Sequence, residues 1–161
     1  MNIIRLAELS DLPHIMPIFE KARKFMQLTG NPSQWIDGYP SEEIITHDIE
    51  QRNFYVETSD NAITGGFAFI TGDEPSYKII QGEWLDNVPY GTIHRLASDG
   101  SRKGFADRCI AFCRNKISTL RADTHKDNLL MQKALLRNGF QYCGIIRVAN
   151  GTERLAYQLQ S

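Results

Sequence analysis

A short segment of this chain, residues 101–106, contains residue types that are suited to chemistry. It has the sequence Ser-Arg-Lys-Gly-Phe-Ala, follows a strand-like stretch at residues 93–97, and opens a segment with helical periodicity. Backbone N–H groups at the start of a helix hold anionic phosphates, and a residue without a large side chain, here Gly104, lets a phosphate approach closely. Arg102 and Lys103 add positive charge there. The segment predicts a pyrophosphate-binding loop, although an ordinary turn between a strand and a helix has the same short pattern.

A second segment, residues 128–140, combines a helix start with a helix stop. Asp127 or Asn128 can cap the helix, and Gly139 can end it before Phe140. The two motifs, in this order, resemble the acetyl-CoA signature and the following asparagine-containing helix of the GNAT superfamily of N-acetyltransferases. The resemblance is specific over residues 90–140 and loose over most of the remaining chain. The blocks at residues 34–40, 82–84 and 89–95 also resemble a small-molecule-type bacterial subgroup of that superfamily.

The resemblance implies a fold and a cofactor site. The fold would be α/β (α+β), with a mixed, mostly antiparallel central sheet, about four flanking helices and splayed central strands. Acetyl-CoA would lie where the strands at residues 90–97 and 119–123 separate. Backbone groups near Leu96 and Ala97 would pair with the pantetheine arm and could polarise the thioester carbonyl, and Asn128 would lie beside that arm. The implied cofactor-binding residues are Leu96, Ala97, Ser101, Arg102, Lys103, Gly104, Phe105, Ala106 and Asn128.

Two positions depart from the family pattern. Ser101 stands where glutamine or arginine is usual. Leu135 stands where many members have a tyrosine that is proposed to protonate the departing thiolate. A thiol with a pKa of about 8.5 leaves passably without full protonation, and Tyr90, Tyr142 or Tyr157 could substitute for the missing acid. A non-catalytic acyl-CoA-binding regulatory module is the alternative that Leu135 permits.

Direct transfer to an amine requires a base, because the amine is protonated near neutral pH. His94 is the first candidate, since it lies on the strand beside the expected acetyl group; a buried histidine bonded to backbone is the competing interpretation. Glu83 is the second, and a solvated loop carboxylate is its alternative. His47 and His125 are interpreted as surface or capping residues. Alternation along the strand predicts that Arg95 faces the side of the sheet opposite His94 and pairs there with a carboxylate.

Aromatic residues mark the expected acceptor site. Trp35 and Tyr39 lie between the first two predicted helices, beside Phe25, and Tyr90 begins the central strand. Trp35, Tyr39 and Tyr90 are therefore assigned to substrate binding. For Trp35 and Tyr39, the loop aromatics, the alternative is that they pack into the core. No acidic cluster points to a polyamine, and no groove-like segment points to a peptide. The predicted reaction is acetyl transfer to a primary amine of a small-molecule acceptor.

The elements that must position these groups follow from periodicity and turn residues. Strands are expected at residues 3–6, 54–57, 63–70, 77–80, 90–97, 119–123, 141–146 and 154–159. Helices are expected after Ser10 or Asp11, after Ser41, after Gly104 and after Asn128. Pro17 should kink the first helix or delay its regular part, because it removes a backbone donor.

Composition narrows the class of protein. The chain has 161 residues, 42% of them apolar, with a formal net charge of -1. This size and balance predict a single domain over residues 1–161 and no nucleic-acid or membrane-surface partner. The spacing of Cys109, Cys113 and Cys143 predicts no metal site, and the first two are interpreted as small buried apolar residues. We expect a cytoplasmic protein, because no signal peptide or membrane span is evident, and a homodimer is compatible with the sequence.

Overall fold

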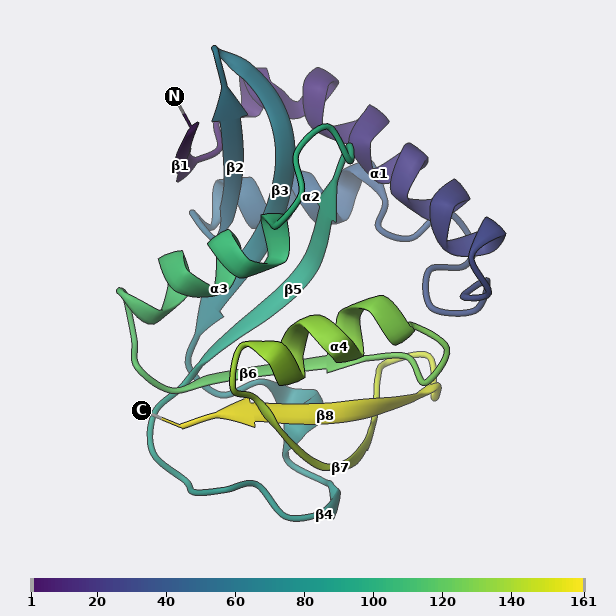
Figure 1. The fold of residues 1–161 in the computed structure, drawn as a ribbon, viewed down its shortest axis with the longest axis vertical. Coiled ribbons are helices and arrows are strands. Elements are labelled where there is room, and N and C mark those ends of the chain that lie inside the picture. Colours follow the sequence, from purple (N-terminus) through teal and green to yellow (C-terminus); the bar gives the residue numbers. More distant parts are fainter. Residues whose placement is uncertain (1, 161) are drawn as a thin grey trace.

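The structure, a computed structural model, describes residues 2–160. Its eight strands form one sheet in the order β1-β2-β3-β5-β6-β8-β7-β4, in which β5 and β6 are parallel and all other neighbours antiparallel (Figure 1). The strands are β1 (Asn2–Leu6), β2 (Phe54–Ser59), β3 (Ala62–Thr71), β4 (Gln81–Gly82), β5 (Gly91–Ser98), β6 (Leu120–Thr124), β7 (Gln141–Arg147) and β8 (Glu153–Leu159). The helices are α1 (Leu12–Leu28), α2 (Glu42–Glu50), α3 (Phe105–Arg114) and α4 (Leu129–Arg137), with short 3-10 turns at Leu9–Asp11 and Pro75–Tyr77. The expected fold class and order of elements are confirmed.

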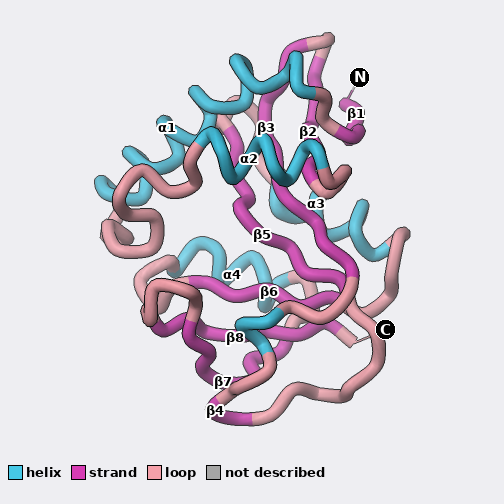
Figure 2. Tube along the Cα trace, turned by 180° about the vertical axis from the view of Figure 1, so that it is seen from behind, coloured by secondary structure: helices cyan, strands magenta, loops and turns pink. Residues whose placement is uncertain are grey.

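The helices cover the two faces of the sheet in pairs. Helices α1 and α2 lie on one face, and α3 and α4 on the other, as the views from opposite sides show (Figures 1 and 2). Apolar residues of α1 and α2 pack with Phe54, Val56, Ala68 and Ala97 of the sheet. We call these the α1/α2 face and the α3/α4 face. No helix within residues 2–160 has the length and apolar character needed to cross a bilayer.

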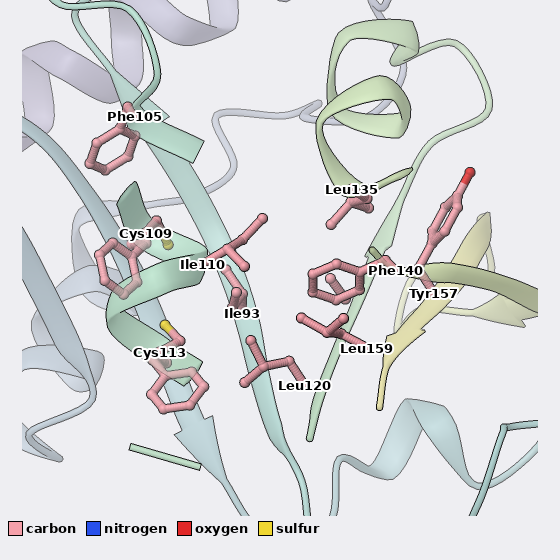
Figure 3. Close-up of a cluster of buried hydrophobic side chains, with 13 residues drawn as sticks. Ile93, Phe105, Cys109, Ile110, Cys113, Leu120, Leu135, Phe140, Tyr157 and Leu159 are labelled. Atoms are coloured by element: carbon pink, nitrogen blue, oxygen red, sulfur yellow. The ribbon is translucent and has the colours of Figure 1, made fainter. Parts of the chain in front are cut away.

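The core on the α3/α4 face is continuous across the two helices. Figure 3 shows α3 side chains on one side of Ile93 and Leu120, with Leu135 and Phe140 on the other. Cys109 and Cys113 have no exposed surface, which confirms that they act as small apolar residues of the core. The apolar spacing of α3 therefore fixes the position of its amino terminus over the sheet.

The starts of α2 and α4 and the end of α4 follow the predicted caps, whereas Asp11, which precedes α1, makes no capping hydrogen bond with its side chain. The Ser41 hydroxyl accepts a hydrogen bond from the backbone N–H of Ile44 at 3.3 Å, at the start of α2. The Asn128 side chain caps α4 in the same way, accepting from Met131 N–H at 3.1 Å. Gly139, at φ +92°, ends α4 in the left-handed conformation that glycine adopts without strain.

One of the two effects expected of Pro17 does not occur, and one expected strand is wrong. Helix α1 runs through Pro17 from Leu12, so its regular part is not delayed; a kink at Pro17 stays a prediction. Pro17 lies near the start of the helix, where the single donor that it removes would bond the carbonyl of Pro13. Residues 77–80 form no strand; Tyr77 ends a 3-10 turn, and the short strand is Gln81–Gly82. The side chain of Tyr77 packs in the interior against Trp84 and Tyr90, and this tertiary packing overrides the local strand propensity.

Candidate active site

A cavity of about 490 Å³ passes between the separated ends of β5 and β6. The ladder between these strands contains only three pairs, ending at Ile93 and Ala122. Beyond that point β5 residues Ile93 to Leu96 and β6 residues Ala122 and Asp123 line the cavity. The expected opening between the central strands is therefore present.

One part of the cavity, which we call the helix end, is formed by α3 and α4. It is lined by Ala106, Ile110, Asn128, Met131 and Leu135. Apart from the Asn128 amide, these side chains are apolar, as suits the uncharged arm of a large cofactor. Leu135 is 2% exposed and carries no proton donor.

The loop before α3 lies next to the helix end and is exposed. Gly104 has φ +85° and precedes Phe105, the first residue of α3. No acceptor within residues 2–160 is hydrogen-bonded to the backbone N–H groups of Arg102, Lys103 or Gly104. These donors and the positive end of the α3 dipole fit an anionic pyrophosphate. Ser101 is held by its own N–H, which donates to Asp99 Oδ1 at 2.8 Å.

Asn128 joins the helix end to the connection between α1 and α2. Its side-chain N–H donates to Gln34 Oε1 at 3.1 Å, while its oxygen caps α4. Gln34 Oε1 also accepts from the Thr124 hydroxyl and the His125 N–H, both at 3.2 Å. Gln34 thus fixes the place where β6 turns into α4. It lies in a block that the family resemblance covers, but sequence reasoning gave it no role.

The middle of β5 contains a β-bulge at Arg95, whose φ is +50°. Gly66 lies opposite Ala97, and Ala68 lies opposite His94, so two β5 residues oppose one β3 residue. His94 shares the α1/α2 face with Ala68, because directly opposed residues point to the same side. Arg95 reaches Asp48 of α2 on that same face, at 2.7 and 2.9 Å.

The bulge corrects one expectation and confirms another. Arg95 does not face the side opposite His94, because the extra residue breaks the strict alternation of the strand. Its pairing with a carboxylate is confirmed by the two bonds to Asp48, and its remaining terminal nitrogen donates to the Tyr39 hydroxyl at 3.1 Å. The charge of Arg95 is therefore neutralised by a protein carboxylate, and this pair holds α2 against β5.

The other part of the cavity, which we call the polar end, contains Glu74, His94, Asp123 and Arg154. His94 Nε2 lies 3.5 Å from Glu74 Oε1, and this contact with His94 is the main reason why the pKa of Glu74 is lowered. The Tyr77 hydroxyl donates to Asp123 Oδ2 at 2.7 Å. Burial raises the pKa of Tyr77 well above its ordinary value, so the phenol keeps its proton.

The predicted site residues fall into three groups. His94, Leu96, Ala106 and Asn128 line the cavity, as do the two loop aromatics. The exposed loop residues Ser101, Arg102, Lys103 and Gly104 lie beside the start of α3, whereas Ala97 and Phe105 belong to the core. Outside the cavity are Glu83 and Tyr90.

The aromatic residues divide in the same way. Trp35 lines the cavity and also packs on Phe19, with ring centroids 5.5 Å apart, so it is part of the core, and its role in substrate binding stays a prediction. Tyr39 lines the cavity and bonds Arg95. Tyr90 is 6% exposed, and its hydroxyl accepts from Glu74 N–H, so it lies behind the polar end. Phe25 is exposed.

The other titratable candidates lie elsewhere. Glu83 is exposed and follows β4 at the edge of the sheet. His47 is exposed on α2. His125 is not a surface residue, since it is 7% exposed and burial lowers its pKa, but its Nδ1 accepts from Asp127 N–H and so caps the turn before α4. Sequence reasoning missed Glu74, Asp123 and Arg154, because each lies on a different element and no local pattern links them.

The chain is similar to solved structures of acetyltransferases. No family model and no curated protein matches the sequence. Among solved structures, a GNAT-family acetyltransferase from Streptococcus agalactiae 2603 is 35% identical, with a TM-score of 0.83 over 99% of this chain and 95% of that one. A GNAT-family acetyltransferase from Listeria monocytogenes 4b F2365 is 19% identical, with a TM-score of 0.73 over 99% and 95% of the two chains. N-acetylglutamate synthase from Neisseria gonorrhoeae, complexed with coenzyme A and N-acetyl-glutamate, is 18% identical, with a TM-score of 0.66 over 99% of this chain and 35% of that one.

Proposed function

This chain belongs to the GNAT superfamily of acetyltransferases, and we propose that its single domain transfers the acetyl group of acetyl-CoA directly to a primary amine of a small-molecule acceptor. The observation that carries the proposal is the continuity of the cavity. One cavity of about 490 Å³ joins the helix end, beside the exposed loop at Gly104, to the polar end around His94. A bound thioester and an acceptor amine can therefore meet between β5 and β6.

The cofactor side of the proposal rests on the fit of the helix end. The backbone N–H groups of Arg102, Lys103 and Gly104 would hold the pyrophosphate, and the apolar helix end would receive the pantetheine arm. Acetyl-CoA supplies an acetyl group that is activated as a thioester. The solved N-acetylglutamate synthase, which has the same fold and contains coenzyme A, supports this choice of cosubstrate.

The acceptor side rests on charge. Glu74 and Asp123 place carboxylates at the polar end, where they would attract an ammonium group. We assign the removal of its proton to His94, directly or through one water, because His94 lines the cavity and Glu74 lies 3.5 Å from its ring. Glu83, exposed and outside the cavity, is not assigned this step.

Two protons leave the ammonium nitrogen in the course of the transfer. His94 takes one proton from the ammonium group and passes it to solvent. The amine nitrogen then bonds to the acetyl carbon as the carbon–sulfur bond breaks, and the second proton leaves the nitrogen for the thiolate. Leu135 offers no proton, and none of the three tyrosines considered as substitutes lines the cavity. The sulfur therefore leaves as thiolate and receives that proton through solvent.

The experiment is a calorimetric titration of acetyl-CoA, followed by a thiol-release assay with amino acids, polyamines, aminoglycosides and short peptides. Saturable binding and amine-dependent thiol release are expected. Binding without release from any amine would overturn the transfer and favour the alternative, a non-catalytic acyl-CoA-binding module in which Leu135 replaces the acid. Absence of binding would overturn the use of acetyl-CoA.

A further inference from the structure

Arg154 of β8 is a buried cation that lines the polar end of the cavity without an ion pair. It is 6% exposed, and no carboxylate of residues 2–160 lies within 4.0 Å of its guanidinium. Its two terminal nitrogens donate to backbone carbonyls, to Gln34 at 2.9 Å and to Glu153 at 3.2 Å. A buried charge without an ion-pair partner costs free energy, and a ligand of opposite charge that binds it would offset that cost.

The surroundings of Arg154 distinguish it from the other arginine of the cavity. The charge of Arg95 is neutralised by the Asp48 carboxylate, and all three of its nitrogens donate to protein acceptors. A guanidinium carries five N–H donors, and the two bonds of Arg154 leave three of them for a ligand. A planar guanidinium with free donors matches the two oxygens of a carboxylate.

The sheet places Arg154 on the same face as the acidic groups. Asp123 lies opposite Ala156, so Arg154, two residues earlier on β8, is its diagonal neighbour on that face. His94 points to this face as well, and Glu74 lies against it. The polar end thus contains an arginine without an ion pair, its diagonal neighbour Asp123, and Glu74 beside the base His94.

We propose that Arg154 binds a carboxylate of the acceptor, so that the substrate is an amine that also carries a carboxylate, as an amino acid does. This inference rests on the proposed function. The acceptor carboxylate would lie on Arg154, and its ammonium group would lie toward Asp123, Glu74 and His94. A phosphate fits less well, because it carries close to two negative charges and would meet two carboxylates with a single unpaired guanidinium to balance them.

The test compares acceptors that differ only in the carboxylate. L-amino acids, their amides and the corresponding amines without a carboxylate are assayed for thiol release. Wild type should prefer the carboxylated compounds in kcat/KM by at least about 30-fold, and Arg154→Gln should abolish that preference. Arg154→Lys, which retains the charge, should retain part of it. Calorimetric binding of acetyl-CoA should be the same in all three proteins.

A matched control is Arg147→Gln, on the neighbouring strand β7. Arg147 is exposed and pairs with Glu153 at 3.0 Å, so its loss removes an arginine without touching the cavity. If Arg154 only fastens the Gln34 backbone, Arg154→Gln would lower kcat/KM equally for all acceptors. That equal loss, or a wild-type preference for amides or simple amines, would overturn the inference and leave acetyl transfer standing.

A binding measurement separates this inference from the proposed function. N-acetyl amino acids and their amides are titrated into the protein in the presence of CoA. Carboxylate-dependent binding that is lost in Arg154→Gln, without thiol release from any amine, would support the carboxylate subsite and overturn acetyl transfer. Equal binding of acids and amides, or no binding of either together with no turnover of carboxylated amines, would overturn the subsite.

Discussion

Nε2 of His94 lies 3.5 Å from Oε1 of Glu74 inside the cavity. The other oxygen of Glu74 accepts a hydrogen bond from Ser76 N–H, and the backbone N–H of Glu74 donates to the Tyr90 hydroxyl. The carboxylate is therefore held in place from behind. A fixed carboxylate beside an imidazole orients the ring and stabilises the imidazolium that forms when the ring takes a proton.

Replacing His94 by alanine should lower kcat by about 10²–10⁴-fold, because the base is lost, while acetyl-CoA binds as before. Added imidazole should restore part of the rate in this variant, measured by thiol release at saturating acceptor. Glu74→Gln should cost about tenfold and should not respond to imidazole, since the ring is still present. The control is His47→Ala, exposed on α2, which should retain the wild-type rate. A His94→Ala enzyme as fast as wild type would remove His94 from the mechanism.

The parts of the site that the sequence predicts are those encoded by local patterns. The cap at Asn128, the stop at Gly139 and the loop at Gly104 each depend on the conformational preferences of one or two residues. The apolar spacing of α3 and α4 then places these ends over the sheet. The loop and its helix could therefore be found without any knowledge of the tertiary fold.

The polar end could not be predicted in this way. Glu74, Asp123 and Arg154 come from a 3-10 turn cap, β6 and β8, and only the strand order brings them together. The bulge at Arg95 contains no glycine, the residue that most often marks a positive φ. The sequence of this strand therefore predicts strict alternation of side chains between the two faces. The bulge is held by the pairing of Arg95 with Asp48, a contact between residues that are remote in sequence.

Gly104→Ala should weaken CoA binding by about tenfold, because the new Cβ would lie 3.2 Å from Arg108 Nη1 and disturb the loop. Pantetheine, which lacks the pyrophosphate, should bind as it does to wild type. Gly100→Ala is the matched control, since Gly100 has a similar φ of +78° but no atom within 4 Å of the added Cβ. Both variants should lose about 1 kcal/mol of stability from the left-handed backbone. Equal CoA affinities of the two variants, measured by calorimetry, would count against the pyrophosphate loop.

Glu57 and Arg108 form an ion pair, and loss of Arg108 should destabilise the protein more than loss of Glu57. Arg108 Nε and Nη2 donate to the Glu57 carboxylate at 2.6 and 2.8 Å. The Arg108 side chain is 27% exposed, whereas that of Glu57 is only 2% exposed. Arg108→Met leaves a buried carboxylate without a partner and should cost about 3–5 kcal/mol. Glu57→Gln leaves an arginine that reaches water and still bonds the Lys103 carbonyl, so it should cost about 1–2 kcal/mol.

The double variant Glu57→Gln with Arg108→Met serves as the control for this pair. It should be more stable in urea than Arg108→Met alone, because no unpaired charge remains buried. Equal stability of the two single variants would show that the burial of Glu57 does not decide the cost.

Because Asp11 forms an ion pair with Arg5, the stability of the folded protein should depend on pH in the acidic range. Arg5 donates to both carboxylate oxygens at 2.8 and 3.0 Å, and Glu8 N–H donates at 2.8 Å; the bonds from Arg5 are the main reason why the pKa of Asp11 is lowered. A lowered folded-state pKa gives stability that is present above the unfolded value, about 3.9, and lost as pH falls through the folded value.

Arg5 is 41% exposed, so Asp11→Asn should cost only about 1 kcal/mol at pH 7. The difference from wild type, read from urea midpoints, should shrink below about pH 4, whereas Asp73→Asn at an exposed position should follow wild type throughout. A difference that stays constant down to the pH of acid unfolding would mean that the Asp11 charge does not contribute.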